Sequence, residues 1–539
     1  MSSSAAKQWV VRDDELDEAT AQQQHVDAEV LHRLKHSADG HHILIPQPDD
    51  NPRNPLNWSE GKKWATLIAI SFAATSPDYG SATGATTLIP QGIDWGLSPN
   101  YVNHSQAGNV FMLGAGGIFA VALSNVYGRL PVAFWMLGLS VIFAVLCAAA
   151  PDFKTFFAAR ILQGFFSAPC QATGLIIVRD IYFFHSQVRK VNIWSGFFIL
   201  SPYVGPIISA AILSSNSENI KLWHWSFGSY SMLCALAFLG VVLFVDETWY
   251  NREIPERNQP LTGGRLARMT GIGRPKGSST RYTLYEAWYR MFAALIKPPV
   301  LAVCISFGLN FAWVVGINTT LPIFLVPLYG FGDKQIALFY FTPVVATILG
   351  EAAAHVINPR IQEWTLKRNH GVWKPENRLI VNLMAYPFCL LGLVLIGFAF
   401  EHHYHYMLIS LAWGIYVFSI MLSTAGYYQY LLDIYPTESG ELAAWINFAR
   451  VIGGFTVSYT IVDFVNSQGA IKAFGIFAGL STIASLFVPA LMYWGPSLRE
   501  TYPSVGLSIP SKTASFVSSS ASGEKDTSSM EKTEVHQIA

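Results

Sequence analysis

The chain has 539 residues, of which 51% are hydrophobic, 14% aromatic and only 13% charged. Its 35 basic residues balance its 35 acidic residues, so the net charge gives no reason to expect nucleic acid as a partner. The mean hydropathy of +0.32 excludes an ordinary water-soluble domain and indicates a protein built into a lipid bilayer.

Twelve apolar runs, nearly free of charge, lie between about Trp64 and Trp494. Because a hydrocarbon core of about 30 Å is crossed by about 20 helical residues, each run predicts one membrane-spanning helix. Pro322 and Pro327 interrupt the run at 299–328, which a membrane helix can tolerate when neighbouring groups satisfy the freed carbonyls. The predicted spans are 65–88, 106–125, 131–150, 156–179, 191–213, 226–245, 299–328, 335–357, 379–399, 406–430, 440–464 and 471–494.

The basic residues sort to one side of these spans. With the amino terminus inside, the internal loops hold 18 Lys and Arg and the external loops hold 4. This bias predicts a multi-pass protein, which we place in the plasma membrane, with both termini in the cytosol. The sequon Asn103-His104-Ser105 would then lie in the first external loop, which predicts a glycosylation site at Asn103.

A polar segment separates the first six spans from the last six. We therefore predict an all-α membrane protein with twelve transmembrane helices in two six-helix bundles, an arrangement typical of secondary carriers. The predicted parts are a cytosolic tail at 1–63, a bundle at 64–246, a cytosolic linker at 247–297, a second bundle at 298–495 and a disordered tail at 496–539.

Five stretches of this chain resemble one known family. In the fourth predicted helix, Arg160, Gln163 and Gly164 have the spacing Arg-x-x-Gln-Gly. The other stretches are Asn54-Pro55-Leu56-Asn57-Trp58-Ser59 with Lys62-Lys63-Trp64, then 246–250, 375–379 and 435–450. Together they resemble the major facilitator superfamily, and within it the fungal drug:proton antiporter group. The resemblance implies two pseudo-symmetric bundles that transport a solute by alternating access.

Two of the family's motifs are altered here. Between the second and third helices, Asn125 stands where the family has an acidic residue, and Val126 and Leu130 replace basic ones. In the fifth helix the family's Gly205-Pro206 is kept, and we expect this pair to support close helix packing, although neighbouring glycines are replaced. The direction of transport, export or import, therefore stays open.

Asp78, near the middle of the first predicted helix, is the main candidate for function. A charge at that depth costs several kcal/mol unless it is paired, hydrated or neutralised. Asp78 either takes up a proton or binds a cationic substrate; the alternative is a structural carboxylate satisfied by neighbouring hydroxyl groups. Arg450 in the eleventh helix could balance Asp78, bind an anionic substrate, or pair within its own bundle.

Other polar groups in the predicted helices are weaker candidates. The resemblance gives Arg160 a part in proton coupling, with Gln163 on a nearby face, and packing is the alternative. Glu351 and His355 share one face of the eighth helix and could pass a proton, or form a solvated pair. Candidate substrate-binding residues, which could instead serve packing, are Asp78, Tyr79, Asn310, Trp313, Asn318, Tyr340, Tyr427, Gln429 and Arg450.

The sequence has no nucleotide-binding Walker motif, so an ion gradient is the remaining energy source. We predict a monomeric, proton-coupled carrier for a small organic molecule, most simply an efflux pump for drugs, toxins or secondary metabolites. The alternatives are proton-coupled uptake of a cationic nutrient such as a polyamine and, more remotely, a transporter-like nutrient sensor. We predict no enzymatic activity, no cofactor and no metal, and no partners beyond substrate, protons and lipid.

Overall fold

The structure is a computed structural model that describes residues 51–216, 219–250, 264–272, 282–369 and 374–503. Residues 1–50 of the predicted tail at 1–63, much of the linker and the tail from 504 onward lie outside these ranges. The first helices are α3 (Glu60–Trp95), α4 (Pro99–Tyr127), α5 (Arg129–Ala148), α6 (Phe153–Ser167), α7 (Pro169–Ile181), α8 (Phe184–Leu213) and α9 (Trp223–Phe244). Two short helices follow, α10 (Arg265–Thr270) and α11 (Leu284–Ile296).

The remaining long helices begin at Pro298. They are α12 (Pro298–Tyr329), α13 (Asp333–Phe339), α14 (Phe341–Arg368), α15 (Ile380–Glu401), α16 (Tyr406–Ile434), α17 (Ser439–Gln468), α18 (Ala470–Ser485) and α19 (Phe487–Thr501). Short 3₁₀ turns occupy Pro55–Asn57, Ile220–Leu222, Pro375–Leu379 and Pro436–Glu438. The described part of the chain thus contains helices and no strand.

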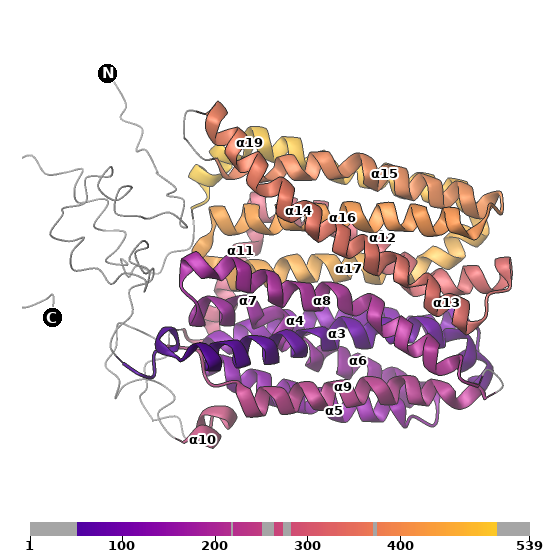
Figure 1. Cartoon of the computed structure of the whole chain (residues 1–539), viewed down its shortest axis with the longest axis horizontal. Helices are drawn as coiled ribbons and strands as arrows, with labels where there is room; N and C mark the ends of the chain where they lie inside the picture. The colour runs from indigo at the N-terminus through magenta and orange to yellow at the C-terminus, as the bar shows by residue number, and fades with distance from the viewer. Residues whose placement is uncertain (1–50, 217–218, 251–263, 273–281, 370–373, 504–539) are drawn as a thin grey trace, which may run out of the picture.

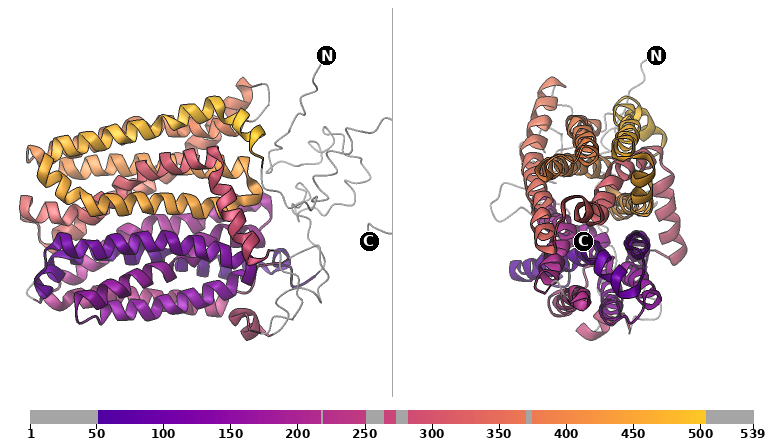
Figure 2. Two further views of the ribbon diagram at one scale, coloured as in Figure 1. Left: turned by 180° about the vertical axis from the view of Figure 1, so that it is seen from behind. Right: turned by 90° about the vertical axis from the view of Figure 1, so that its right-hand side faces the viewer.

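The long helices run side by side and form two groups (Figure 1). Helices α3 to α9 make one group and α12 to α19 the other, which the reverse view also shows (Figure 2). Helices α4 and α17 pack against each other across the boundary, and α8 packs against α13 and α14. We call these groups the first half and the second half.

Eleven helical segments in the described ranges are long and apolar enough to cross a membrane. Each predicted span except the first overlaps one of these segments almost completely. That span, 65–88, lies on α3, which has 36 residues but carries a polar stretch around Asp78. Helix α3 is buried along this stretch by its neighbours, so its polar groups face protein rather than lipid.

Helix α12 is continuous from Pro298 to Tyr329, so it tolerates Pro322 and Pro327 as expected of a membrane helix. Pro322 has no N–H and cannot donate to the carbonyl of Asn318, four residues earlier. The Tyr340 hydroxyl donates to that carbonyl instead, at 2.5 Å. A neighbouring side chain therefore replaces the lost backbone hydrogen bond, and the helix does not break.

Ion pairs gather at the end of the molecule where α3, α5, α12 and α17 begin, which we call the charged end. Arg129 of α5 binds Asp180 of α7 at 2.8 Å, and Lys297 binds Glu438 at 2.6 Å. Arg290 of α11 binds Glu441 of α17 at 3.2 Å. The other pairs at this end include Lys62–Asp246, Arg268–Asp246, Arg378–Asp433 and Arg499–Glu376.

Glu247, next to Asp246, caps the first turn of α5. Its carboxylate accepts hydrogen bonds from the backbone N–H groups of Arg129 and Leu130, at 3.0 and 3.1 Å. Burial raises the pKa of Glu247, although these N–H donors act in the opposite direction.

Two of the stretches that resemble the family meet at the charged end. Lys62 pairs with Asp246 at 3.1 Å, and its ammonium group lies 3.8 Å from the centre of the Trp58 ring.

The prediction of glycosylation at Asn103 is wrong. Asn103 lies in the second turn of α4, not in a loop, and its side chain is fully buried. Its amide nitrogen donates to the backbone carbonyl of Ser458 on α17, at 2.7 Å. An asparagine held between two helices in this way is not available to carry a glycan.

Gly116 sets how closely α4 approaches α6. A Cβ atom built on Gly116 would lie 2.0 Å from the backbone oxygen of Phe165, whereas one built on Gly475 of α18 would have no neighbour within 4 Å. We expect Gly116→Ala to destabilise the protein by about 1–3 kcal/mol, since a backbone group cannot move aside easily. Thermal unfolding of the purified protein in detergent would measure this change.

Gly475→Ala is the matched control, and it should be neutral or stabilising because alanine favours a helix. Equal unfolding temperatures for the two variants would contradict the proposed close approach of α4 and α6.

Candidate functional site

The sequence candidates Asp78 and Arg450 meet between the two halves. Asp78 is on α3 and Arg450 on α17, and one guanidinium nitrogen lies 3.0 and 3.2 Å from the two carboxylate oxygens. Both residues are more than nine-tenths buried. Of the pairings considered from the sequence, the structure therefore selects the one between Asp78 and Arg450, and it joins the halves at mid-depth.

Two amides complete this contact. Gln171 of α7 donates from its side-chain nitrogen to Asp78 at 2.6 Å, and Arg450 donates to the Asn447 side-chain oxygen at 2.9 Å. Two hydrogen-bond donors of this network are unused, because the Arg450 Nε and the Asn447 amide nitrogen have no hydrogen-bond partner in the described part of the chain. The network therefore offers donors to a further polar group.

Aromatic side chains surround the Arg450 guanidinium. The Phe311 ring centre is 5.2 Å from its central carbon. A cavity of about 20 Å³ adjoins it, lined from the first half by α8 and from the second by α12, α16 and α17. Such a space admits about one water molecule. Its lining residues are Phe198, Ile199, Pro202, Tyr203, Phe307, Phe311, Met421, Thr424, Tyr428 and Arg450.

Arg160 forms a second buried polar cluster, inside the first half. Its guanidinium donates to the backbone carbonyls of Gly80, at 2.7 Å, and Ser81, at 3.2 Å. In the described ranges Arg160 forms no ion pair, and it is 1% exposed. Its charge is therefore balanced by helix carbonyls of α3, placed within one turn of Asp78.

Gln163 ties the Arg160 cluster to α4 and α9. Its side-chain oxygen accepts a 2.7 Å hydrogen bond from Asn109, which also donates to the Arg160 carbonyl at 2.6 Å. Its amide nitrogen donates to the hydroxyl of Tyr230 on α9. Gln163 is thus a link between helices, and α3 carries both polar networks.

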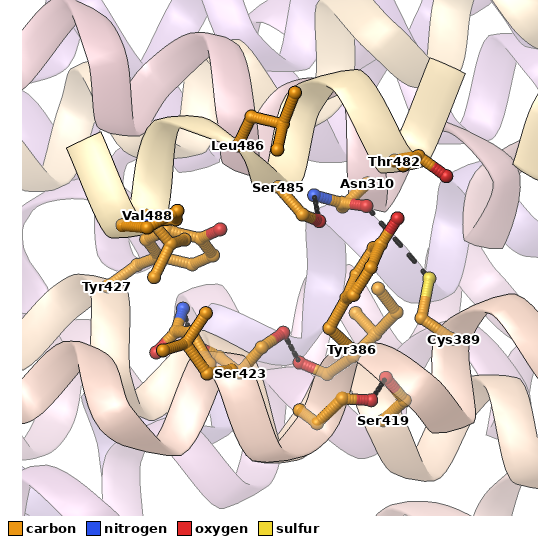
Figure 3. A pocket seen from close by; sticks show the side chains of 15 residues that line it. Asn310, Tyr386, Cys389, Ser419, Ser423, Tyr427, Thr482, Ser485, Leu486 and Val488 are labelled. Carbon is orange, nitrogen blue, oxygen red and sulfur yellow. Dashed lines mark hydrogen bonds between the residues drawn. The ribbon is translucent and has the colours of Figure 1, made fainter. Parts of the chain in front are cut away.

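The remaining candidates are dispersed. Tyr79 stacks on Tyr230 within the first half, with ring centres 6.0 Å apart. Trp313 donates to Ser481 at 2.9 Å and packs within the second half. Asn310 and Tyr427 line a different cavity, described below (Figure 3).

Asn318 and Tyr340 serve the structure of α12, and Asn318 also donates to the Pro202 carbonyl of α8 at 3.3 Å. Gln429 is half-buried, and its side-chain oxygen has no hydrogen bond within the described residues. On α14, Glu351 is half-buried and His355 exposed, and no hydrogen bond joins them in the described part.

The Gly205-Pro206 motif brings α8 close to α3. A Cβ atom on Gly205 would lie 2.6 Å from the carbonyl oxygen of Tyr79. This observation supports the packing function expected of the motif.

The sequence interpretation missed Gln171 as the partner of Asp78. Its only sequence signal was an amide eight residues after Gln163, roughly two helical turns further on.

The halves also touch at both ends. At the charged end, Arg179 of α7 donates to the Ser439 hydroxyl of α17. At the opposite end, Asn100 donates to Asp463 at 2.9 Å, and His104 stacks on Tyr459 with ring centres 4.1 Å apart. The Asp78–Arg450 contact therefore lies between further contacts of the two halves at both ends.

Comparison with known proteins agrees with this architecture. The family model described as Major Facilitator Superfamily matches residues 71–458. The chain belongs to this superfamily. It is 24% identical to polyamine transporter 3 of Saccharomyces cerevisiae, over 84% of this chain and 71% of that protein. It is also 24% identical to multidrug transporter FLR2 of Candida glabrata, over 84% and 77% of the two chains.

The fold is similar to that of a solved D-xylose-proton symporter. The TM-score is 0.60 at 15% sequence identity, over 79% of this chain and 97% of the symporter. These findings confirm the predicted fold class and the resemblance to the fungal drug and polyamine transporter group. The chain is a multi-pass membrane transporter of this superfamily.

The contact across the halves can be tested by a double-mutant cycle. Asp78→Asn or Arg450→Gln alone leaves one buried charge unpaired, and we expect each to destabilise the protein by about 3–5 kcal/mol. The double variant should lose less than the sum, by about 0.5–3 kcal/mol. Denaturant unfolding of the purified protein would provide these free energies.

The control cycle uses Arg378 and Asp433, whose side chains are 20% and 23% exposed and 3.0 Å apart. Its coupling should stay within about 1 kcal/mol, because the pair is partly solvated. Strict additivity in the Asp78–Arg450 cycle would contradict the contact.

Proposed function

We propose that this protein is a proton-coupled secondary transporter that exports a small organic molecule by alternating access. The observation that supports it is the buried contact of Asp78 with Arg450, which joins α3 of one half to α17 of the other. The carboxylate is the one group of this contact that can lose its charge by taking up a proton.

Protonation of Asp78 changes the balance between the halves. A neutral carboxyl group no longer balances the Arg450 guanidinium, which then stays buried without a counter-charge. That state is costly, so it favours separation of the halves and entry of water or substrate beside Arg450. Loss of the proton restores the pair and favours the closed arrangement.

Arg160 holds the segment of α3 that carries Asp78. Arg160 donates to the Gly80 and Ser81 carbonyls. A shift of α3 when the halves separate therefore either breaks these hydrogen bonds or moves Arg160 together with α3. We therefore assign Arg160 and Gln163 to the transmission of movement from Asp78 to α4 and α9, and not to direct proton uptake.

A substrate cation suits this site. It can replace the Arg450 guanidinium beside Asp78, and Phe311, Tyr203 and Tyr428 supply aromatic faces of the kind that attract cations. A competing cation and a proton would then act on the same carboxylate, which is the simplest basis for exchanging one for the other.

The second candidate is uptake of a cationic nutrient such as a polyamine. The name of the yeast relative, a polyamine transporter, favours a cation of this class. We propose a plasma-membrane location with both termini, and hence the charged end, in the cytosol, where the 18 basic residues would face the inner leaflet. We further propose a monomer whose bundles span 64–246 and 298–495, joined by the linker 247–297.

The test is flux through proteoliposomes with an imposed pH gradient, with ethidium and radiolabelled spermine as probes. The wild type should move at least one probe against its gradient, and the direction relative to the proton gradient separates export from uptake. Asp78→Asn should reduce this flux to the level of empty vesicles, because an amide takes up no proton.

Glu363→Gln is the matched control, since it makes the same carboxylate-to-amide change at an exposed position of α14, outside both buried polar networks. It should leave the flux unchanged. Gradient-driven transport by Asp78→Asn at the wild-type rate would reject Asp78 as the proton carrier.

Arg160→Lys tests the transmission step. A lysine keeps the charge but cannot span two successive carbonyls with a planar fork, so we expect a loss of about 1–3 kcal/mol in stability and fewer protons moved per substrate. The proton-to-substrate ratio, measured with a pH dye, is the deciding measurement. Arg378→Lys is the control, and a normal ratio in Arg160→Lys would assign Arg160 to packing alone.

A further inference from the structure

A cavity of about 140 Å³ lies within the second half (Figure 3). Its walls come from α12, α15, α16, α18 and α19, so it is separate from the Asp78–Arg450 contact between the halves. The fifteen lining residues include polar groups on α12, α15, α16 and α18, and none of the fifteen carries a charge.

The cavity is formed by a change of helix at Leu486, where α18 ends and α19 begins. Helix α18 packs on both α15 and α12, whereas α19 continues along α12. Pro489 lies in the first turn of α19 and has no N–H to donate to the carbonyl of Ser485. Space is therefore left between α15 and the start of α19, next to a backbone carbonyl that lacks its helical donor.

The deep wall has unused hydrogen-bonding groups. Asn310 donates to the Ser306 carbonyl at 2.9 Å and to the Ser485 hydroxyl at 3.4 Å. Among the described residues, its side-chain oxygen accepts only from the weakly donating Cys389 thiol, at 3.9 Å. The Tyr386 hydroxyl lies near the hydroxyl groups of Thr482 and Ser485, but it has no partner with regular hydrogen-bond geometry in the described part of the chain. Figure 3 shows Asn310, Ser485 and Tyr386 on the same side of the cavity.

The mouth of the cavity is apolar and faces outward. Leu383 on α15 is 41% exposed and Leu486 is 62% exposed, and Pro489 beside them is exposed too. In a membrane-spanning chain, exposed apolar side chains at this position contact lipid. A molecule dissolved in the bilayer can therefore reach the cavity sideways, without passing through the space between the halves.

We propose that this cavity binds the hydroxyl-bearing end of a neutral, membrane-dissolved molecule. The hydroxyl group donates to the Asn310 side-chain oxygen and accepts from the Tyr386 hydroxyl. A cavity of about 150 Å³ holds a molecule the size of benzene, so only the end of the ligand is enclosed and its apolar remainder lies along Leu383 and Leu486. A charged head group is excluded, since it would be buried without a counter-charge.

The probe is a long-chain alcohol with a photoreactive diazirine, applied to the full chain in lipid nanodiscs. Labelled peptides should come from the cavity mouth around Leu383 and Leu486. Ser423→Leu fills the cavity and Leu383→Trp blocks the mouth, so each should reduce this labelling several-fold. If Ser423→Leu impairs folding because it fills the core, Leu383→Trp still tests the proposal, since Leu383 faces lipid and its replacement leaves the core unchanged.

Two matched control variants make the same substitutions, serine to leucine and leucine to tryptophan, at positions away from the cavity. Ser467→Leu replaces an exposed serine on α17 whose hydroxyl donates to the carbonyl three residues earlier, as that of Ser423 does. Leu391→Trp alters another exposed leucine of α15. Both should label like the wild type.

Competition identifies the class of ligand and its source. Unlabelled long-chain alcohol should compete, whereas the trimethylammonium compound of equal chain length should not. Competition by a sterol points to a bilayer lipid as the source, and competition by 4-propylphenol points to a small dissolved solute. Labelling spread evenly over the lipid-facing helices, unchanged labelling in both Ser423→Leu and Leu383→Trp, or equal competition by the cation would overturn the proposal.

Discussion

The pairing of Asp78 with Arg450 is the constraint on which the arrangement of the halves depends. Neither charge is tolerable alone at that depth, and each half carries one of them. The halves therefore meet at mid-depth for as long as both groups stay ionised. Gln171 and Asn447 fix the orientation of the pair, so a change of charge on the carboxylate acts on the interface between the halves and not only on one side chain.

Because the membrane interior holds no water, several polar side chains form hydrogen bonds with backbone groups that would otherwise have no partner. Tyr340 replaces the hydrogen bond that Pro322 cannot give, and Arg160 is balanced by two carbonyls of α3. Side chains that look available for a substrate in the sequence are therefore occupied. Some of the groups left unsatisfied are more informative, namely those beside Arg450 and in the lateral cavity of the second half.

These two places differ in chemistry. The space between the halves is small and lies next to a guanidinium and a carboxylate, as expected of a site that opens only when the halves separate. The lateral cavity is uncharged and open towards lipid while the halves are closed. Charged solutes and neutral membrane-dissolved molecules would therefore meet this protein at separate sites.

The sequence by itself determined the membrane class and eleven of the twelve predicted spans, because hydrophobic run length is a local property set by bilayer thickness. Its motifs gave the superfamily, and the cost of a buried charge singled out Asp78 and Arg450. Only the tertiary structure decided that these two pair with each other, that Gln171 joins them, and that Asn103 is buried between helices. Those facts depend on which helix faces meet, and a contact between residues hundreds of positions apart leaves no local pattern in a single sequence.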